Sequence, residues 1–321
     1  MRISLEIQKN DIFARVAENY KTNFDKLEER RFHFASRLFL WSGDEFSKQK
    51  LAELKAEYIG QAKSEHAEKI KSLLAENSNG KDFLFKKERE KFFAKYPLLK
   101  KYNKLLFKNI VCKTIYGLDL RTTIKKYVTM EEFLALGKSL LRDREAIAVL
   151  STAAVNYFYA LDFFLGGQES ILDPNFFLEI AEDNKFYQEK DVAVLRVYLL
   201  THCIIGESAF YARPIERHRE VYEKMLVKLE EIIKENYEKI SLDSKVEFLV
   251  CAQLCEHASF LKEKILGELK ASFDSKGNYF IEKGKIKNEA TFRTSEHRNV
   301  LALMAFHFKK TKSEKRGLAK G

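Results

Sequence analysis

Two cysteines and a histidine near residue 250 have the residue types and the spacing of metal ligands. Cys251 and Cys255 lie four positions apart, and His257 follows two positions later. Residues four apart share one face of a helix, so both thiols would point toward the same ion. Thiolates and imidazoles bind Zn²⁺ well, and a site with three protein ligands and one open position activates a bound water. The spacing therefore indicates a zinc site that His202 or His297 completes, unless both cysteines pack in the core as small apolar residues.

Four polar residues lie in or beside strongly apolar segments and are candidates for a ligand pocket. They are Asn156, His202, Glu207 and His297. A polar group enclosed by apolar neighbours needs a polar partner, because burial without one is unfavourable. We therefore expect these residues to form either a structural polar cluster or the lining of a pocket for a peptide or a small ligand.

The basic stretch YARPIERHRE, residues 211–220, is a candidate anion site at the start of a helix. Cations near a helix N-terminus oppose the helix dipole unless an anion is present, so a phosphate or a carboxylate would suit this position. Glu216 and Glu220 are alternative partners for the cations. The cationic candidates are Arg213, Arg217, His218 and Arg219.

The segment 81–108 is the most basic part of the chain, and aromatic residues stand between its lysines. Cations neutralise phosphates and rings stack on bases, so this composition is typical of a surface that binds single-stranded nucleic acid. The alternative is a pair of helices that buries its rings and exposes its lysines to solvent. The candidate nucleic-acid contacts are Lys91, Lys95, Lys100, Lys101, Lys104 and Lys108.

Several classes of enzyme find no support in the sequence. It contains no P-loop, Gly-x-Gly-x-x-Gly, Gly-x-Ser-x-Gly or His-Glu-x-x-His motif, which are the signatures of nucleotide hydrolysis, Rossmann cofactors, α/β-hydrolases and zincins. The four cysteines form no Cys-x-x-Cys pair, so we expect reduced thiols. The N-terminus has no signal-like apolar core, and the longest uncharged run, 146–161, is too short for a bilayer span. A soluble cytoplasmic protein without a membrane partner is expected.

Four apolar helical patterns recur at nearly equal intervals. Their centres are Leu150, Leu199, Val250 and Val300, so the steps are 49, 51 and 50 residues. A fixed period of this length is typical of repeated helical pairs. Only three prolines and thirteen glycines occur in 321 residues, which favours helices over a turn-rich β fold. The expected pairs are 131–142 with 144–165, 174–184 with 188–211, 215–239 with 242–257, and 259–273 with 295–308.

In each pair the first helix has one apolar stripe, whereas the second is apolar nearly all round. Half-exposed and enclosed helices in alternation predict an outer and an inner layer, as in an α/α toroid or a curved solenoid. The fold class is therefore all-α. A β-hairpin insert is expected near 274–290, and the helices 6–40 and 45–77 are expected to form an N-terminal helical hairpin.

Charge divides the chain into three regions. Residues 1–130 carry 28 Lys and Arg against 17 Asp and Glu, a net charge of +11, whereas residues 131–307 carry 23 against 29, a net charge of −6. We therefore expect a basic N-terminal helical region over 1–128, an α/α repeat domain over 129–308 and a disordered basic tail over 309–321.

The repeat region resembles the α/α-toroid proteins, including the lanthionine cyclases, the β-subunits of protein prenyltransferases and uncharacterised bacterial relatives. The resemblance covers about 129–308 and is best supported by THCIIGESAFYA and SEHRNVLALMAF. It implies a ring of helices whose inner face holds the functional site. The lanthionine cyclases use a Cys and a Cys-His pair as zinc ligands, whereas Cys255 and His257 are separated by Glu256.

Three functional hypotheses follow, and the sequence does not decide whether the protein is an enzyme. The first is a toroid-like protein that binds a peptide or small ligand on its inner face, with the basic N-terminal region contacting a protein or peptide partner. The second is a zinc-dependent enzyme on the same ring. The third is a nucleic-acid-binding protein that uses residues 81–108 and the basic tail. The cofactor is accordingly either none or zinc.

Overall fold

The computed structural model describes residues 2–76, 86–166, 171–187, 192–281 and 289–306. In these residues the chain is almost wholly α-helical, and the β structure is one two-stranded antiparallel sheet. The predicted all-α fold with a small β-hairpin is confirmed. Contacts divide the chain into two compact units, Met1–Leu54 with Ile240–Gly321 (unit 1) and Lys55–Lys239 (unit 2). The charge-based division near residue 128 stays a prediction, as does the disordered tail, which lies outside the described residues.

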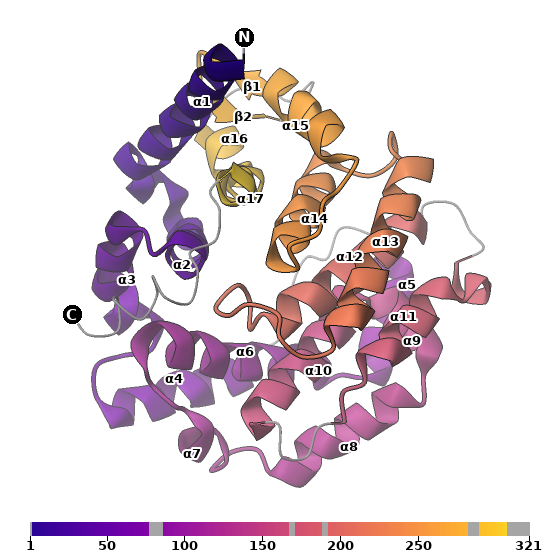
Figure 1. Ribbon diagram of the computed structural model, residues 1–321. Helices are drawn as coiled ribbons and strands as arrows, with labels where there is room; N and C mark the ends of the chain where they lie inside the picture. The colour runs from indigo at the N-terminus through magenta and orange to yellow at the C-terminus, as the bar shows by residue number, and fades with distance from the viewer. Residues whose placement is uncertain (1, 77–85, 167–170, 188–191, 282–288, 307–321) are drawn as a thin grey trace. The chain divides into compact units, whose positions relative to one another are not determined.

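Unit 1 is built around helix α17 (Glu296–Phe306), which packs between α2 (Arg31–Ser42) and α14 (Leu242–Leu254) (Figure 1). Almost every residue of α17 is buried, as its all-round apolar pattern predicts. The remaining elements of this unit are α1 (Arg2–Thr22), η1 (Phe24–Arg30), most of α3 (Glu45–Tyr58), α15 (Lys262–Ala271) and α16 (Glu289–Thr294).

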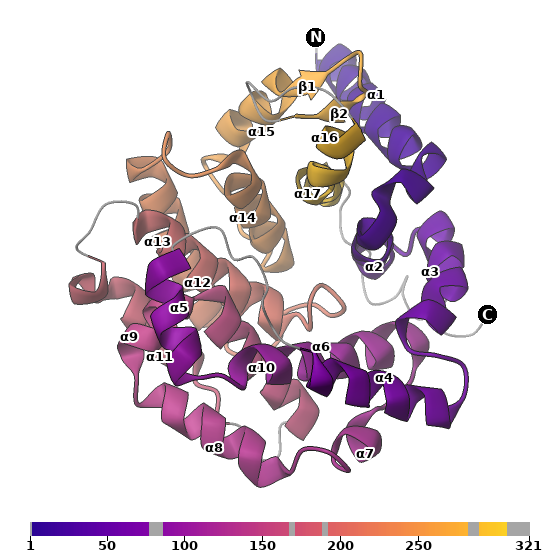
Figure 2. The ribbon, with the colours of Figure 1, turned by 180° about the vertical axis from the view of Figure 1, so that it is seen from behind.

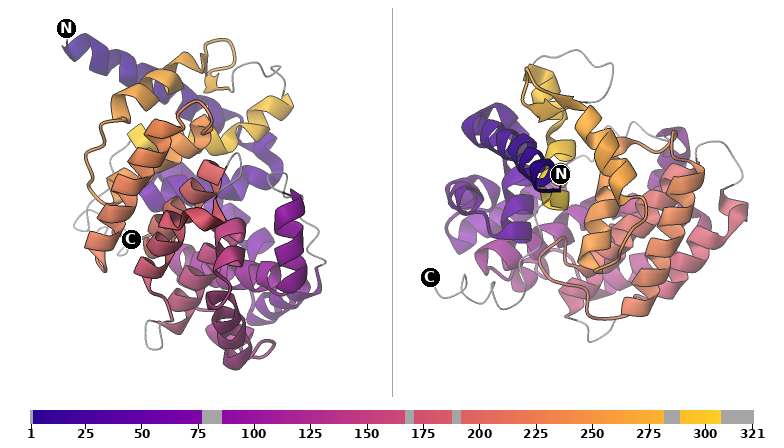
Figure 3. Two further views of the ribbon diagram at one scale, coloured as in Figure 1. Left: turned by 90° about the vertical axis from the view of Figure 1, so that its right-hand side faces the viewer. Right: turned by 45° about the horizontal axis from the view of Figure 1, so that its top comes forward.

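The hairpin of unit 1 consists of β1 (Phe273–Asp274) and β2 (Tyr279–Phe280) and lies against α1 (Figures 1 and 3). The side chain of Asn299, on α17, accepts a hydrogen bond from the Phe280 amide at 2.8 Å and donates one to the Phe280 carbonyl at 2.9 Å. These two hydrogen bonds join strand β2 to helix α17. Residues 282–288 of the predicted insert lie outside the described residues.

Unit 2 is built in the same way around α10 (Thr152–Leu165), which packs between α6 (Leu99–Tyr116) and α12 (Val192–Glu207) (Figure 1). Buried residues are the majority in α10 and α12, whereas 8 of the 18 residues of α6 are buried. The other elements are α4 (Lys63–Ala75), α5 (Lys86–Lys95), α7 (Arg121–Ile124), α8 (Met130–Leu141), α9 (Arg144–Leu150), α11 (Pro174–Glu182), η2 (Asn184–Phe186) and α13 (Arg219–Glu235).

The helix expected over 144–165 is broken, and this prediction is corrected. Ser151 has φ 39° and ψ −104°, and the chain bends by 104° between α9 and α10. Helix α5 packs on α9 (Figure 2). Its Arg89 donates to the Val149 carbonyl at 3.2 Å and to the Ser151 hydroxyl at 3.0 Å, so groups on both sides of the break have hydrogen-bond partners. No single helix in the described residues is long and apolar enough to cross a membrane. The bent α9–α10 pair meets the criteria of length and composition only when taken together.

The expected helices 6–40 and 45–77 are also each interrupted. Glu28, with φ 49°, lies at a kink between α1 and α2. Gly60, with φ 87°, separates α3 from α4, and this left-handed conformation suits glycine because it lacks a Cβ. Both interruptions occur inside continuous apolar periodicity, which explains why the sequence predicts longer helices.

Local signals at the helix starts are confirmed. The residues Thr129-Met-Glu-Glu132 match the capping-box pattern, and the box is formed, with the Glu132 amide donating to the Thr129 hydroxyl and the Thr129 amide donating to the Glu132 carboxylate. Asp173 caps α11, whose first residue is Pro174, as the Asp-Pro pair predicts.

Replacing Thr129 with alanine is expected to lower the free energy of unfolding by about 1 kcal/mol, because an orphan amide of α8 loses its acceptor. Urea denaturation followed by circular dichroism would measure the change. Thr123→Ala, in the short helix α7, is the matched control and should change the stability by less than about 0.5 kcal/mol. Equal effects of the two substitutions would contradict the role of the capping box.

Candidate functional site

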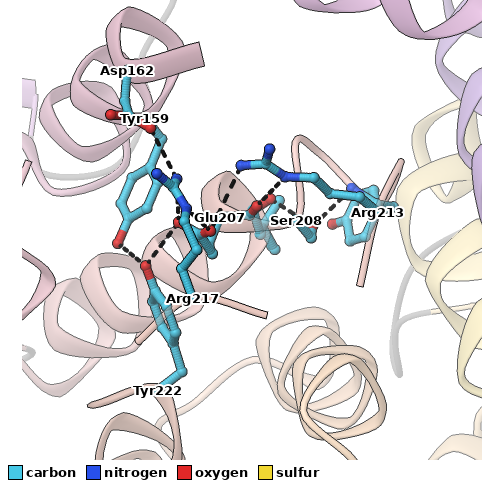
Figure 4. Close-up of polar contacts among 9 residues, drawn as sticks. Tyr159, Asp162, Glu207, Ser208, Arg213, Arg217 and Tyr222 are labelled. Carbon is cyan, nitrogen blue, oxygen red and sulfur yellow. Dashed lines mark hydrogen bonds and ion pairs between the residues drawn. The ribbon is translucent and has the colours of Figure 1, made fainter. Parts of the chain in front are cut away.

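The most extensive buried polar cluster of unit 2 joins two carboxylates to an arginine, and we call it the Arg217 cluster (Figure 4). Asp162 lies in the last turn of α10, and Glu207 is the last residue of α12. Arg217, in the segment before α13, donates from Nη2 to Asp162 at 2.9 Å and from Nε to Glu207 at 3.0 Å. The carboxylate side chains are only 5% and 3% exposed, whereas that of Arg217 is 43% exposed. One guanidinium therefore compensates two buried charges.

The backbone after α12 is strained in a way that positions a second arginine. Ala209, Phe210 and Tyr211 have φ values of 49°, 55° and 75°, which side chains with a Cβ rarely adopt. The Ser208 hydroxyl accepts a hydrogen bond from the Tyr211 amide at 2.9 Å and supports this turn. Arg213 then reaches back, donating to the Glu207 carbonyl at 3.0 Å, with its Nη2 3.6 Å from the Glu207 carboxylate. The turn thus brings a second cation beside Glu207.

Two tyrosines form the buried floor of the Arg217 cluster. Tyr222, on α13, donates to Glu207 Oε2 at 3.2 Å, and its hydroxyl lies 2.9 Å from that of Tyr159 on α10. Burial raises the pKa of both phenols well above the usual value, and the nearby Glu207 charge acts in the same direction. Both tyrosines therefore stay protonated and act as hydrogen-bond donors.

The charges of the Arg217 cluster balance, because Asp162 and Glu207 face Arg213 and Arg217. Burial lowers the pKa of Arg217, but hydrogen bonds to Glu207 and Asp162 outweigh it, and the pKa of the guanidinium is raised. Asp162 Oδ1 is buried and has no hydrogen-bond partner among the described residues. The Arg217 cluster orients the half-exposed guanidiniums of Arg213 and Arg217. Its main physical consequence is that it stabilises the packing of α10, the end of α12 and the segment before α13.

The predicted pocket residues are distributed over both units. Glu207 belongs to the Arg217 cluster, whereas the His202 Nδ1 lies 2.9 Å from the Asn156 Oδ1, a pairing between α12 and α10. These three residues belong to unit 2, and His297 belongs to unit 1. Tyr159 and Tyr222, which complete the cluster, carried no signal in the sequence, because buried tyrosines are indistinguishable from ordinary core residues there.

His297 lies on α17 beside two acidic residues of α14. Its Nδ1 is 3.9 Å from Asp243, and its Nε2 is 3.9 Å from Glu247. The ring of His33, on α2, faces it at a centroid distance of 5.6 Å. His33 comes from the aromatic stretch RRFHFASRLFLW, and nothing in the sequence indicates its proximity to a residue more than 260 positions away.

The predicted zinc ligands lie at the C-terminal end of α14. Cys251 and Cys255 are 0% and 3% exposed, and Cys255 is the residue after the helix. Glu256, with φ 57°, turns the chain before His257. Among the described residues, no three His, Cys, Asp or Glu side chains are grouped so that they could hold a metal ion. The zinc site stays a prediction.

The predicted nucleic-acid lysines lie on α5 and α6 of unit 2. Burial lowers the pKa of Lys108 to about 8, and its Nζ lies 3.4 Å from the centroid of the Tyr58 ring. Lys100 lies over Phe93 at 3.9 Å. Nucleic-acid binding stays a prediction. Three of the lysines bond to acceptors within unit 2: Lys95 to Asp143 at 2.6 Å, Lys104 to Glu76 at 2.9 Å and Lys108 to the Tyr58 carbonyl at 2.8 Å.

A cavity of about 510 Å³ lies at another part of unit 2, around α7, the end of α10 and the start of α8. Its lining combines cations with apolar side chains. None of the four predicted pocket residues lines this cavity. The sequence gives no indication that these helix ends lie together. The lining residues are Asp119, Arg121, Thr122, Lys125, Met130, Phe164 and Leu165.

A family model described as a domain of unknown function, DUF3541, matches residues 16–318. The chain therefore belongs to this family. No curated protein and no solved structure matches the chain.

Proposed function

We propose that unit 2 binds a small anionic ligand with an apolar portion in the cavity lined by Arg121, Lys125 and Phe164. The observation that carries this proposal is a concave site whose lining combines two cations, Arg121 and Lys125, with apolar side chains. A volume of about 510 Å³ lies within the roughly 300–1,000 Å³ usual for small-molecule sites.

Arg121 is oriented before any ligand arrives. Its Nε and Nη2 donate to the Asp119 carboxylate, at 2.9 Å and 2.6 Å respectively. This bonding lowers the pKa of Asp119, so the pair is fully ionised at neutral pH. Among the described residues no acceptor bonds to Arg121 Nη1, which leaves a fixed donor for a ligand oxygen.

The local charge favours an anion. Asp119 is compensated by Arg121 and also lies 3.6 Å from Lys113. Lys125 lines the cavity, and its ammonium has no partner within the described part of the chain. The positive charge of Lys113 and Lys125 is therefore in excess, and an incoming phosphate, sulfonate or carboxylate would be attracted.

The lining also includes three apolar side chains, Met130, Phe164 and Leu165. Phe164, at the end of α10, is 1% exposed, so Met130 and Leu165 provide the apolar surface that a ligand can contact. Burial of ligand carbon against these side chains would contribute about 25 cal/mol per Å² of apolar surface. An ion without an apolar portion would forgo this contribution.

The toroid, the zinc enzyme and the nucleic-acid-binding protein, which the sequence predicts, stay proposals. The mostly buried helices α10, α12, α14 and α17 support the helical-pair architecture. The closed α/α toroid with an inner-face ligand remains a proposal. The zinc enzyme and the nucleic-acid-binding protein remain alternatives. Metal analysis of the purified protein tests the first, and salt-dependent binding of single-stranded DNA tests the second.

Calorimetric titration with naphthyl phosphate tests the proposal. Lys125→Gln is expected to weaken binding about tenfold, because it removes one cation from the cavity. Lys126→Gln, at the adjacent position and not among the lining residues, is the matched control and should change binding by less than about twofold. Inorganic phosphate and naphthol should each bind more weakly than naphthyl phosphate. Equal losses in the two variants, or no binding of naphthyl phosphate, would refute the proposal.

A further inference from the structure

Unit 1 contains an imidazole–carboxylate pair that the ligand-binding proposal does not use. His33 Nδ1, on α2, lies 2.7 Å from Glu296 Oε1 at the start of α17. The Glu296 side chain is 0% exposed, and that of His33 is 29% exposed. The carboxylate is thus enclosed behind a ring that solvent reaches. Glu296 Oε2 has no hydrogen-bond partner among the described residues, so the carboxylate is not fully satisfied by structural contacts.

The contact with Glu296 determines which nitrogen of His33 carries the proton. A carboxylate accepts hydrogen bonds, so the proton of the neutral ring lies on Nδ1 and the lone pair lies on Nε2. In the described part of the chain no residue bonds to His33 Nε2. The ring therefore has an unprotonated Nε2, with its tautomer and orientation held by a buried acid.

The surroundings keep the ring neutral. Burial lowers the pKa of His33 to about 4, and the positive charge of Arg37 acts in the same direction, whereas Glu296 opposes it. His33 is therefore unprotonated throughout the neutral range. On α17, His297 faces the ring, and the acids near His297 are Asp243 and Glu247 of α14.

Two arginines lie near these carboxylates, Arg298 beside Asp243 and Arg30 beside Glu296. Arg298, whose side chain is 7% exposed, donates to Asp243 at 2.5 Å and compensates its charge. Arg30, at the end of η1, places Nη1 3.6 Å from Glu296 Oε2 and is 38% exposed. Arg30 is thus a half-exposed cation beside the pair, and a cation in this position stabilises negative charge that develops on a reacting group.

We infer that His33 and Glu296 form a general-base site that hydrolyses ester substrates by activating water. In this step His33 Nε2 takes a proton from water while the water oxygen attacks the ester carbonyl carbon. Arg30 stabilises the oxyanion, and Glu296 acts as a positioning residue that stabilises the imidazolium. The carbon–oxygen bond to the alcohol then breaks, and Nε2 returns the proton to the leaving oxygen. Ester and water give acid and alcohol, and nothing is oxidised or reduced.

Hydrolysis of p-nitrophenyl acetate by the full chain tests this inference. His33→Asn is expected to reduce the protein-dependent rate at least tenfold, because the amide can keep the hydrogen bond to Glu296 but cannot act as a base. His218→Asn is the matched control. His218 is exposed and has φ 51°, a conformation that asparagine tolerates, so this variant should hydrolyse the ester as fast as the wild type.

The pH profile distinguishes this base from an ordinary histidine. The wild-type rate should fall as the pH decreases through about 4, where His33 becomes protonated, and not through 6.5. Glu296→Gln keeps the shape of the side chain and should lower the rate with little change in KM. A wild-type rate no faster than that of His33→Asn, or an acid limb at 6.5, would overturn the assignment.

A chemical measurement keeps the inference testable if a variant fails to fold. Diethyl pyrocarbonate acylates neutral imidazole, and mass spectrometry of the wild-type protein shows which rings react. His33 should react at pH 5 at nearly its pH 7 rate, because its ring stays neutral down to about pH 4. A His33 that stays unmodified, or that reacts more than tenfold more slowly at pH 5 than at pH 7, would overturn the inference.

Discussion

Replacing Arg217 with methionine is expected to lower the free energy of unfolding by about 2–3 kcal/mol. The substitution leaves Asp162 and Glu207 buried without their shared cation, and both side chains are at most 5% exposed. Removing one partner of a fully buried ion pair typically costs about 3–5 kcal/mol. The expected loss is smaller here, because solvent reaches the 43% exposed Arg217 and Arg213 remains beside Glu207. Urea denaturation measures the change.

Arg219→Met is the matched control for this substitution. Arg219 pairs with Glu223 at 3.2 Å on the surface of α13, and both side chains are about half exposed. Such a pair contributes roughly 0.3–0.5 kcal/mol, so its loss should be small. Combining Arg217→Met with Glu207→Gln should destabilise the protein by less than the sum of the single changes, because the neutral amide no longer needs the cation. Equal effects of Arg217→Met and Arg219→Met would show that the buried carboxylates do not depend on Arg217.

Gly206→Ala is expected to cost about 2–3 kcal/mol. A Cβ at this position on α12 would lie 2.5 Å from Cγ and 2.7 Å from Cβ of Tyr159. These atoms are at the base of the tyrosine side chain, so they cannot move aside by a simple rotation of its end. Overpacking of a core typically costs about 1–3 kcal/mol. Displacement of Tyr159 would in addition strain its contact with Tyr222, whose hydroxyl lies 2.9 Å away.

Gly267→Ala is the control and should have the opposite sign. Gly267 lies inside α15, and a Cβ added there would meet no atom within 4 Å. Alanine in an open helix position stabilises by roughly 0.5–1 kcal/mol relative to glycine. Thermal unfolding followed by circular dichroism distinguishes the two variants. A midpoint that falls equally in both, or rises in Gly206→Ala, would contradict the close contact with Tyr159.

The sequence predicts the helix starts and the buried helices well because these depend on neighbouring residues. The capping box at Thr129 and the Asp173–Pro174 start act within one turn of helix. The apolar residues of α12, α14 and α17 recur at short intervals that any environment would bury. The two-residue strands of the hairpin follow in the same way from a turn between aromatic residues.

The candidate sites could be predicted only in part. Glu207 and His297 stood out as polar residues in apolar segments, but their partners did not. Asp162 and Arg217 are 55 positions apart, and His33 and Glu296 are 263 positions apart. No local pattern encodes contacts at these separations. The cavity lined by Arg121 and Phe164 was missed for the same reason, because it lies among α7, the end of α10 and the start of α8, which are distant in the sequence.

The sequence by itself determined that this protein is built from apolar helices with half-exposed partners, because periodicity and capping are properties of short segments. Only the tertiary structure decided where those helices break and which polar groups meet. The break at Ser151 forms where Arg89 from another helix supplies hydrogen bonds. The His33–Glu296 pair forms because α2 packs on α17. Packing between distant segments, which minimises buried unsatisfied groups, selects these contacts from the many that local sequence allows.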